Sequence, residues 1–139
     1  MEKNTFQVDI RVYYEDTDAG GVVYYANYLR YFERARTEFL RAAGIDAAEW
    51  AQKARIEFAV ADAKVYYKAP AKLGDMLSVE ANIEESGGAY MVFGYAVRLK
   101  ESGRLLVEGS TKLVCLGENF KPRRIPGEIS EALAQFIRR

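Results

Sequence analysis

The stretch from Tyr25 to Ala43, YANYLRYFERARTEFLRAA, is the clearest helical segment of this 139-residue chain, and the rest of the fold must be built around it. Its apolar residues recur at steps of three and four, which is the spacing of one face of an α-helix. Arg34 and Glu38 lie off that face and are spaced as an i,i+4 ion pair, and Gly44 is placed to end the helix. The predicted apolar face consists of Tyr28, Phe32, Ala35, Phe39 and Ala43.

The sequence on either side of this helix predicts strands. Residues 6–14, FQVDIRVYY, alternate between apolar and polar positions as a half-buried strand does. After the helix, DAAEWAQKA predicts a short second helix, and the C-terminal PGEISEALAQFIRR (126–139) predicts a last one. Between these two, short turn signals separate four candidate strands, at residues 56–69, 75–86, 89–102 and 103–117.

These elements leave few ways to build a core. No helix lies between the four later strands to make parallel crossovers, so the sheet is expected to be mainly antiparallel. Nothing else in the chain can cover the apolar stripe of the long helix, so a curved sheet must wrap it. We therefore predict a single α+β domain over residues 1–139, with one long central helix and a five-stranded sheet.

Composition excludes several classes of function. Twenty basic residues balance twenty acidic ones, so no net charge favours nucleic acid or an anionic membrane. The N-terminus has no apolar signal region, and no run of about 18 apolar residues predicts membrane insertion. Cys115 is the only cysteine, so no internal disulfide can form, which fits a cytoplasmic location.

The chain contains no histidine. This removes imidazole as a base, a nucleophile or a metal ligand, and no metal or other cofactor is expected. If the protein is an enzyme, a carboxylate, a tyrosine, a lysine or backbone dipoles must perform the chemistry.

Three carboxylates precede the long helix in the segment EDTDAGG (15–21). A carboxylate before a helix is commonly a cap, but Asp18 lies several residues ahead of the helical periodicity. The free N–H groups and the positive dipole end of a helix also suit a developing negative charge. Glu15 and Asp16 are expected to be solvated loop charges.

The pattern D-x-D-x-x-G-x-V-x-Y-x-N-Y, which runs from Asp16 to Tyr28, resembles the hotdog-fold thioesterases. Within them it is similar to the 4-hydroxybenzoyl-CoA thioesterase-like family, in its Tol-Pal-associated acyl-CoA thioesterase branch. The segments VYYKAPAKLGDML (65–77) and VCLGENFKPRRIP (114–126) extend the resemblance over nearly the whole chain.

This resemblance implies roles for individual residues. Asp18 would be the catalytic carboxylate, as nucleophile or general base, and the backbone N–H of Tyr25 would face the thioester carbonyl. Tyr14, Gly21 and Tyr28 would lie beside the substrate. The position of Tyr25 is histidine in many members of that branch and tyrosine in the original 4-hydroxybenzoyl-CoA enzyme, so only a backbone role is retained.

The implied function is hydrolysis of acyl-CoA, with short-chain or aromatic acyl groups favoured. An acyl-carrier-protein thioesterase and a non-catalytic acyl- or partner-binding module remain alternatives, whereas a hotdog dehydratase would need a histidine. The implied assembly is a homodimer or homotetramer with its active site between subunits. Ser86–Ala89 stand where the 4-hydroxybenzoyl-CoA enzyme has basic residues that contact phosphates, and the basic Lys121–Arg124 is either a phosphate contact or a solvated loop.

Overall fold

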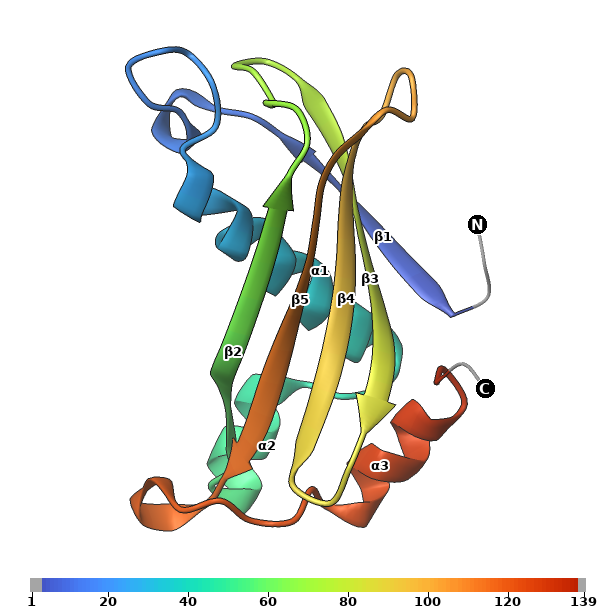
Figure 1. The fold of residues 1–139 in the computed structure, drawn as a ribbon. Helices are drawn as coiled ribbons and strands as arrows, with labels where there is room; N and C mark the ends of the chain where they lie inside the picture. Colours follow the sequence, from blue (N-terminus) through green and yellow to red (C-terminus); the bar gives the residue numbers. More distant parts are fainter. Residues whose placement is uncertain (1–3, 138–139) are drawn as a thin grey trace.

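The computed structural model describes residues 4–137, whose helices and strands follow the predicted order (Figure 1). The end of the predicted C-terminal helix, at Arg138 and Arg139, lies outside the described residues. Three short 3₁₀ helices cover Tyr14–Asp16, Tyr25–Asn27 and Glu118–Phe120. The other elements are β1 (Thr5–Arg11), α1 (Tyr28–Ala42), α2 (Ala47–Ala54), β2 (Glu57–Tyr67), β3 (Met76–Ser86), β4 (Tyr90–Leu99), β5 (Leu105–Leu116) and α3 (Gly127–Ala134).

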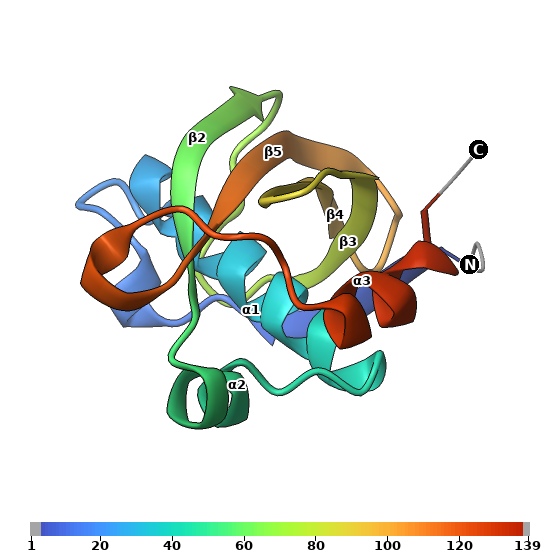
Figure 2. The same cartoon turned by 90° about the horizontal axis from the view of Figure 1, so that it is seen from below.

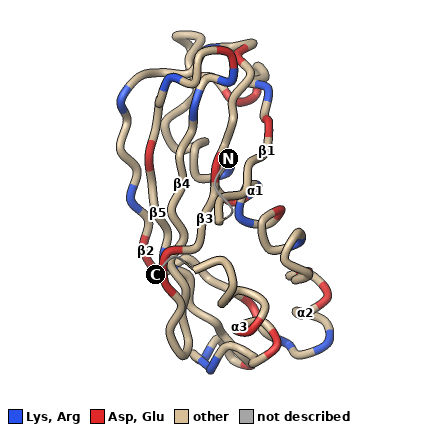
Figure 3. The backbone as a smooth tube through the Cα atoms, turned by 90° about the vertical axis from the view of Figure 1, so that its right-hand side faces the viewer, with Lys and Arg blue, Asp and Glu red and all other residues tan. Residues whose placement is uncertain are grey.

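The five strands form one antiparallel sheet in the order β1-β3-β4-β5-β2. Seen along the strands, the sheet curves around α1 (Figure 2). From the side, α1 and α2 lie together on one side of the sheet, and acidic and basic residues are interspersed along the chain (Figure 3). The predicted α+β architecture, one long helix wrapped by five strands, is confirmed.

The core forms where α1 faces the sheet. Its buried face contains the predicted residues except Ala43, which is half-buried, and it also includes Tyr31 and Leu40. The Phe32 ring stacks on Tyr95 of β4, with ring centroids 4.4 Å apart. On β5, a Cβ at Gly109 would lie 2.4 Å from the Phe32 ring, so the absence of a side chain there lets the helix approach the sheet.

The helix ends as predicted at Gly44, which has a φ of 87°. The N–H of Ile45 donates to the carbonyl of Leu40 at 2.8 Å, the hydrogen bond of a Schellman motif. The predicted pair between Arg34 and Glu38 is wrong, because Glu38 pairs instead with Arg41, at 3.2 Å.

β1 is shorter than predicted, since it ends at Arg11 rather than Tyr14. The chain turns there into a 3₁₀ helix, in which the N–H of Thr17 donates to the carbonyl of Tyr14. This turn starts the connection to α1, and the connection carries the candidate catalytic residue. Among residues 4–137, no helix has both the length and the apolar character needed to cross a membrane.

Candidate active site

Asp18 lies on a narrow loop between β1 and α1. Thr17 and Val23 form an antiparallel bridge at the base of the loop. Inside it, the N–H of Asp18 donates to the carbonyl of Val22 at 2.9 Å. Gly21 has a φ of 78°, a conformation that favours glycine, while nothing lies within 4 Å of where its Cβ would be. Gly21 is therefore needed for the shape of the loop.

The carboxylate of Asp18 is exposed and held on one side only. Its Oδ1 accepts a hydrogen bond from the N–H of Gly20 at 2.8 Å, and no group among residues 4–137 donates to Oδ2. A Cβ at Gly20 would lie 3.3 Å from Oδ1, so glycine gives this carboxylate room. An oriented carboxylate with one open oxygen is suited to attack a carbonyl carbon or to accept a proton from water.

The helix that follows begins with the 3₁₀ turn Tyr25–Asn27. The N–H of Asn27 donates to the carbonyl of Tyr24, but within the described residues no oxygen accepts the N–H of Tyr25 or of Ala26. Unpaired N–H groups at the positive end of a helix dipole stabilise negative charge. This is the electrostatic environment that a thioester oxygen requires as it gains charge.

A pocket of about 300 Å³ lies beside this helix start. Tyr28 is buried in its wall, and its hydroxyl accepts a hydrogen bond from the N–H of Ala71 at 3.3 Å. Tyr67 meets Tyr28 edge to face, with ring centroids 5.7 Å apart. Burial raises the pKa of both tyrosines, so both hydroxyls stay protonated at neutral pH. This aromatic pocket is lined by Val23, Tyr25, Tyr28, Tyr67, Lys68, Ala69 and Pro70.

The predicted site residues relate to the aromatic pocket in different ways. Tyr25 and Tyr28 line it. Asp18 and Gly21 belong to the loop whose closing residue, Val23, also lines it. Tyr14 is not among the lining residues, and its side chain is 80% exposed.

Sequence reasoning missed Tyr67. This residue lies 42 positions after Tyr25, yet its hydroxyl donates to the carbonyl of Tyr25 at 2.9 Å. The only sequence signal for a role of Tyr67 was that it forms an aromatic pair with Tyr66 at the end of a predicted strand. Such pairs are also common in ordinary sheet packing.

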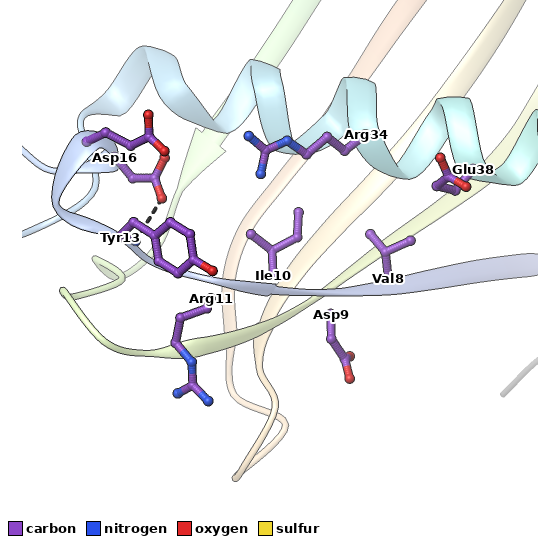
Figure 4. A pocket seen from close by; sticks show the side chains of 9 residues that line it. Val8, Asp9, Ile10, Arg11, Tyr13, Asp16, Arg34 and Glu38 are labelled. Atoms are coloured by element: carbon purple, nitrogen blue, oxygen red, sulfur yellow. Dashed lines mark hydrogen bonds between the residues drawn. The ribbon is translucent and has the colours of Figure 1, made fainter.

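The expectation that Asp16 is a solvated loop charge is wrong. Asp16 is only 6% exposed, and both of its carboxylate oxygens accept hydrogen bonds from the protein. Its Oδ1 accepts a hydrogen bond from Nδ2 of Asn27 at 3.0 Å. Its Oδ2 accepts one from the N–H of Tyr13 at 2.8 Å, which Figure 4 shows. Glu15, its neighbour, is exposed as expected.

A second hollow, of about 360 Å³, lies between β1 and α1 (Figure 4). Charged side chains of both signs line it, including Arg34 and Glu38, and neither Asp18 nor Tyr25 is among them. The aromatic pocket is therefore the better candidate for an acyl group. Within residues 4–137, no group of three or more His, Cys, Asp or Glu side chains is placed to hold a metal ion.

A long helix wrapped by a curved antiparallel sheet is the hotdog fold, the fold of known thioesterases. Two solved structures with this fold are similar to most of the chain. A 1,4-dihydroxy-2-naphthoyl-CoA thioesterase from Synechocystis has a TM-score of 0.87 and 26% identity, and the match covers 94% of this chain and 96% of that one. A hypothetical protein from Thermus thermophilus has a TM-score of 0.90 and 31% identity, over 97% and 99% of the two chains.

Sequence comparison gives the family. The model of the thioesterase-like superfamily matches residues 12–133. An acyl-CoA thioesterase of Haemophilus influenzae is 41% identical over 134 residues, which are 95% of this chain and 96% of that protein. The chain belongs to the thioesterase-like superfamily.

Proposed function

We propose that this protein hydrolyses acyl-CoA thioesters to a free acid and coenzyme A. One observation carries the proposal: an exposed carboxylate, Asp18, lies on the loop that leads into unpaired N–H groups and an aromatic pocket. Relatives about 40% identical over most of the chain are named acyl-CoA thioesterases or acyl-CoA thioester hydrolases. A cytoplasmic location is part of this proposal.

Hydrolysis has two chemical requirements, and this site offers a group for each. Asp18 either attacks the thioester carbon, forming an acyl-aspartyl anhydride that water then cleaves, or removes a proton from the attacking water. The thiolate of coenzyme A is the leaving group in both routes. The N–H of Tyr25 faces the carbonyl oxygen as it becomes negative, and loss of one such donor costs other enzymes roughly 2.7–4 kcal/mol.

The size and lining of the aromatic pocket favour small acyl groups. Its volume of about 300 Å³ is at the lower end of the range for small-molecule sites, about 300–1,000 Å³. Three tyrosine rings line it, and they suit a short aliphatic or an aromatic acyl group better than a long chain.

The basic segment Lys121–Arg124 is the proposed contact for the coenzyme A phosphates. It packs against the turn between β3 and β4, where the N–H of Ile125 donates to the carbonyl of Gly88 at 2.8 Å. A guanidinium nitrogen of Arg124 lies 3.5 Å from where a Cβ of Gly88 would be. Arg124 is exposed, and arginine pairs well with phosphate. Arg124 therefore stands close to the turn that lacks its own basic residues.

The proposed acyl and phosphate contacts lie at opposite ends of the sheet in one chain (Figure 1). One substrate molecule would therefore have to bind across two protomers. β2 is the outer strand at one edge of the sheet, and its exposed side chains include Val60 and Tyr66. An antiparallel partner along β2 would cover this edge and bring opposite ends of two chains together, giving a homodimer, or a homotetramer built from it.

Thiol release from a panel of thioesters tests the proposal. The panel contains short-chain, long-chain and aromatic acyl-CoAs, the matching pantetheine thioesters and the matching acyl-carrier-protein thioesters. We expect turnover of acyl-CoA, fastest with short or aromatic groups. Arg124→Gln should raise KM for acyl-CoA and leave the pantetheine thioester unchanged. Release from the carrier protein alone would overturn the coenzyme A assignment, and binding of the panel without release would favour the binding module.

Sedimentation velocity tests the assembly. Val60→Asp places a charge on the outer strand and should convert the assembly to monomers with much lower turnover. Phe120→Gln changes another exposed apolar residue, on the loop after β5, without adding a charge beside Lys121, and should leave the sedimentation of the assembly unchanged. A wild-type protein that sediments as an active monomer would contradict the proposed shared site.

A further inference from the structure

We infer that Asp16 is a positioning residue, whose buried carboxylate holds the loop of Asp18 in a fixed relation to the start of α1. The inference rests on the proposed function, because it concerns the geometry of that reaction. Asp16 would touch neither the substrate nor the reacting atoms.

Asp16 accepts hydrogen bonds from three residues around the catalytic loop, two from backbone N–H groups and one from a side chain. Its Oδ2 accepts the N–H of Tyr13, where the chain leaves β1, at 2.8 Å (Figure 4). Its backbone carbonyl accepts the N–H of Tyr24, where the loop returns, at 2.9 Å. Its Oδ1 accepts a hydrogen bond, 3.0 Å long, from the side-chain Nδ2 of Asn27 at the start of the helix. One residue thus joins the strand end, the loop and the helix.

Asp16 and Asn27 form a clamp that is mostly shielded from solvent, although Asp16 also lines the charged hollow between β1 and α1. Asp16 is 6% exposed and Asn27 is 8% exposed. A buried carboxylate is stable only when donors satisfy it, and losing one partner leaves the other uncompensated. The buried hydroxyl of Tyr31 has no hydrogen-bond partner among the described residues and lies near enough to Asp16 to be affected by its charge. Burial, and then the negative charge of Asp16, raise the pKa of Tyr31.

The clamp lies between the two reactive segments. Asp18 is two residues after Asp16, and Tyr25 is two residues before Asn27. The hydrogen bond between Asp16 and Asn27 therefore sets the relation between the proposed carboxylate and the proposed N–H donor. The intervening loop is closed on itself by the bridge between Thr17 and Val23, so its orientation relative to the helix is what remains to be fixed. A misplacement of about 1 Å at such a site can cost about 100-fold in rate.

Three variants and one matched control test this role by steady-state kinetics on the best acyl-CoA. Asp16→Ala removes both side-chain acceptors and should lower kcat about 100-fold, with KM within about threefold. The kcat of Asp16→Asn should stay within about tenfold of wild type. The amide oxygen of the new side chain still accepts the N–H of Tyr13, and the side chain of Asn27 can rotate to accept a hydrogen bond from the new NH₂ group. Asn27→Ala, which leaves Asp16 with one side-chain donor, should lower kcat in the same way.

The control is Thr111→Val. It removes a buried hydrogen bond, 2.6 Å long, between Thr111 and the hydroxyl of Tyr95, inside the sheet and away from the loop. It should lower the denaturation midpoint as the clamp variants do and leave kcat unchanged. If Asp16→Ala does not fold, the kcat of Asn27→Ala is compared with that of Thr111→Val instead.

Amide hydrogen exchange gives a second readout that does not depend on turnover. Exchange at the N–H groups of Asp18 and Gly21, both bonded within the loop, should be faster in Asn27→Ala and unchanged in Thr111→Val. Unchanged loop exchange, or a kcat within about threefold of wild type in a folded Asp16→Ala, would overturn the inference. Wild-type protein without turnover on any thioester would instead overturn the proposed function, and the catalytic role of Asp16 with it.

Discussion

The hydroxyl of Tyr67 donates a 2.9 Å hydrogen bond to the backbone carbonyl of Tyr25, and so joins the last residue of β2 to the first turn of the helix. The acceptor carbonyl belongs to the peptide group whose N–H is that of Ala26. A hydrogen bond to a carbonyl polarises its peptide group and strengthens the N–H on the other side. The edge strand is therefore coupled to the electrostatics of the helix start.

Tyr67→Phe removes this hydrogen bond and keeps the ring in the aromatic pocket. A typical hydrogen bond contributes about 0.5–1.5 kcal/mol net, so kcat/KM for acyl-CoA should fall about two- to tenfold. Tyr66→Phe is the matched control, since Tyr66 is exposed on the same strand and does not line the pocket. Equal kcat/KM values for the two variants would show that the hydroxyl of Tyr67 has no part in turnover.

Gly109→Ala should destabilise the fold. Its Cβ would lie 2.4 Å from the Phe32 ring and 2.8 Å from the backbone carbonyl of Lys64, so either the helix or β2 must move. Overpacking of this kind costs about 1–3 kcal/mol in the free energy of unfolding, which urea denaturation measures. Gly127→Ala is the control, since nothing lies within 4 Å of its Cβ position. Equal unfolding free energies for the two variants would contradict this account of the core.

Stability should fall at alkaline pH. Burial raises the pKa of Tyr28, Tyr31 and Tyr95 above their ordinary value of 10.0. The folded protein therefore holds these protons more tightly than the unfolded chain does. The free energy of unfolding should be insensitive to these groups below about pH 10 and should decline as pH rises through the folded values.

Urea denaturation between about pH 8 and about pH 11 measures this decline. A spectrophotometric titration should show the buried tyrosines ionising after the exposed ones, such as Tyr14. A free energy of unfolding that stays constant over the whole range would contradict the assigned burial.

The architecture was predictable because its signals are local. The three- and four-residue steps from Tyr28 to Phe39 identify the helix, and Gly44 ends it with its own backbone conformation. The four later strands were identified by turn residues between apolar runs. The loop with Asp18 was found because its whole motif resembles a known family.

The surroundings of the loop were not predictable, because they depend on contacts across the fold. Asp16 looks like any loop carboxylate in the sequence, and only Asn27, eleven residues later, and the turn at Tyr13 make it buried. The bond from Tyr67 to Tyr25 spans 42 residues and needs the folded sheet to form. The spacing of neighbouring residues in the sequence predicts neither contact.

The initial rates of thiol release by Asp18→Asn and by the control Glu15→Gln test whether the carboxylate of Asp18 performs the hydrolysis. Asn keeps the side-chain shape and an oxygen that can accept the N–H of Gly20, but it lacks the negative charge. Glu15 is an exposed carboxylate three residues away, so its variant controls for loss of charge alone. We predict that Asp18→Asn lowers kcat about 100-fold or more and that Glu15→Gln leaves it unchanged. A kcat for Asp18→Asn within about threefold of wild type would contradict the account.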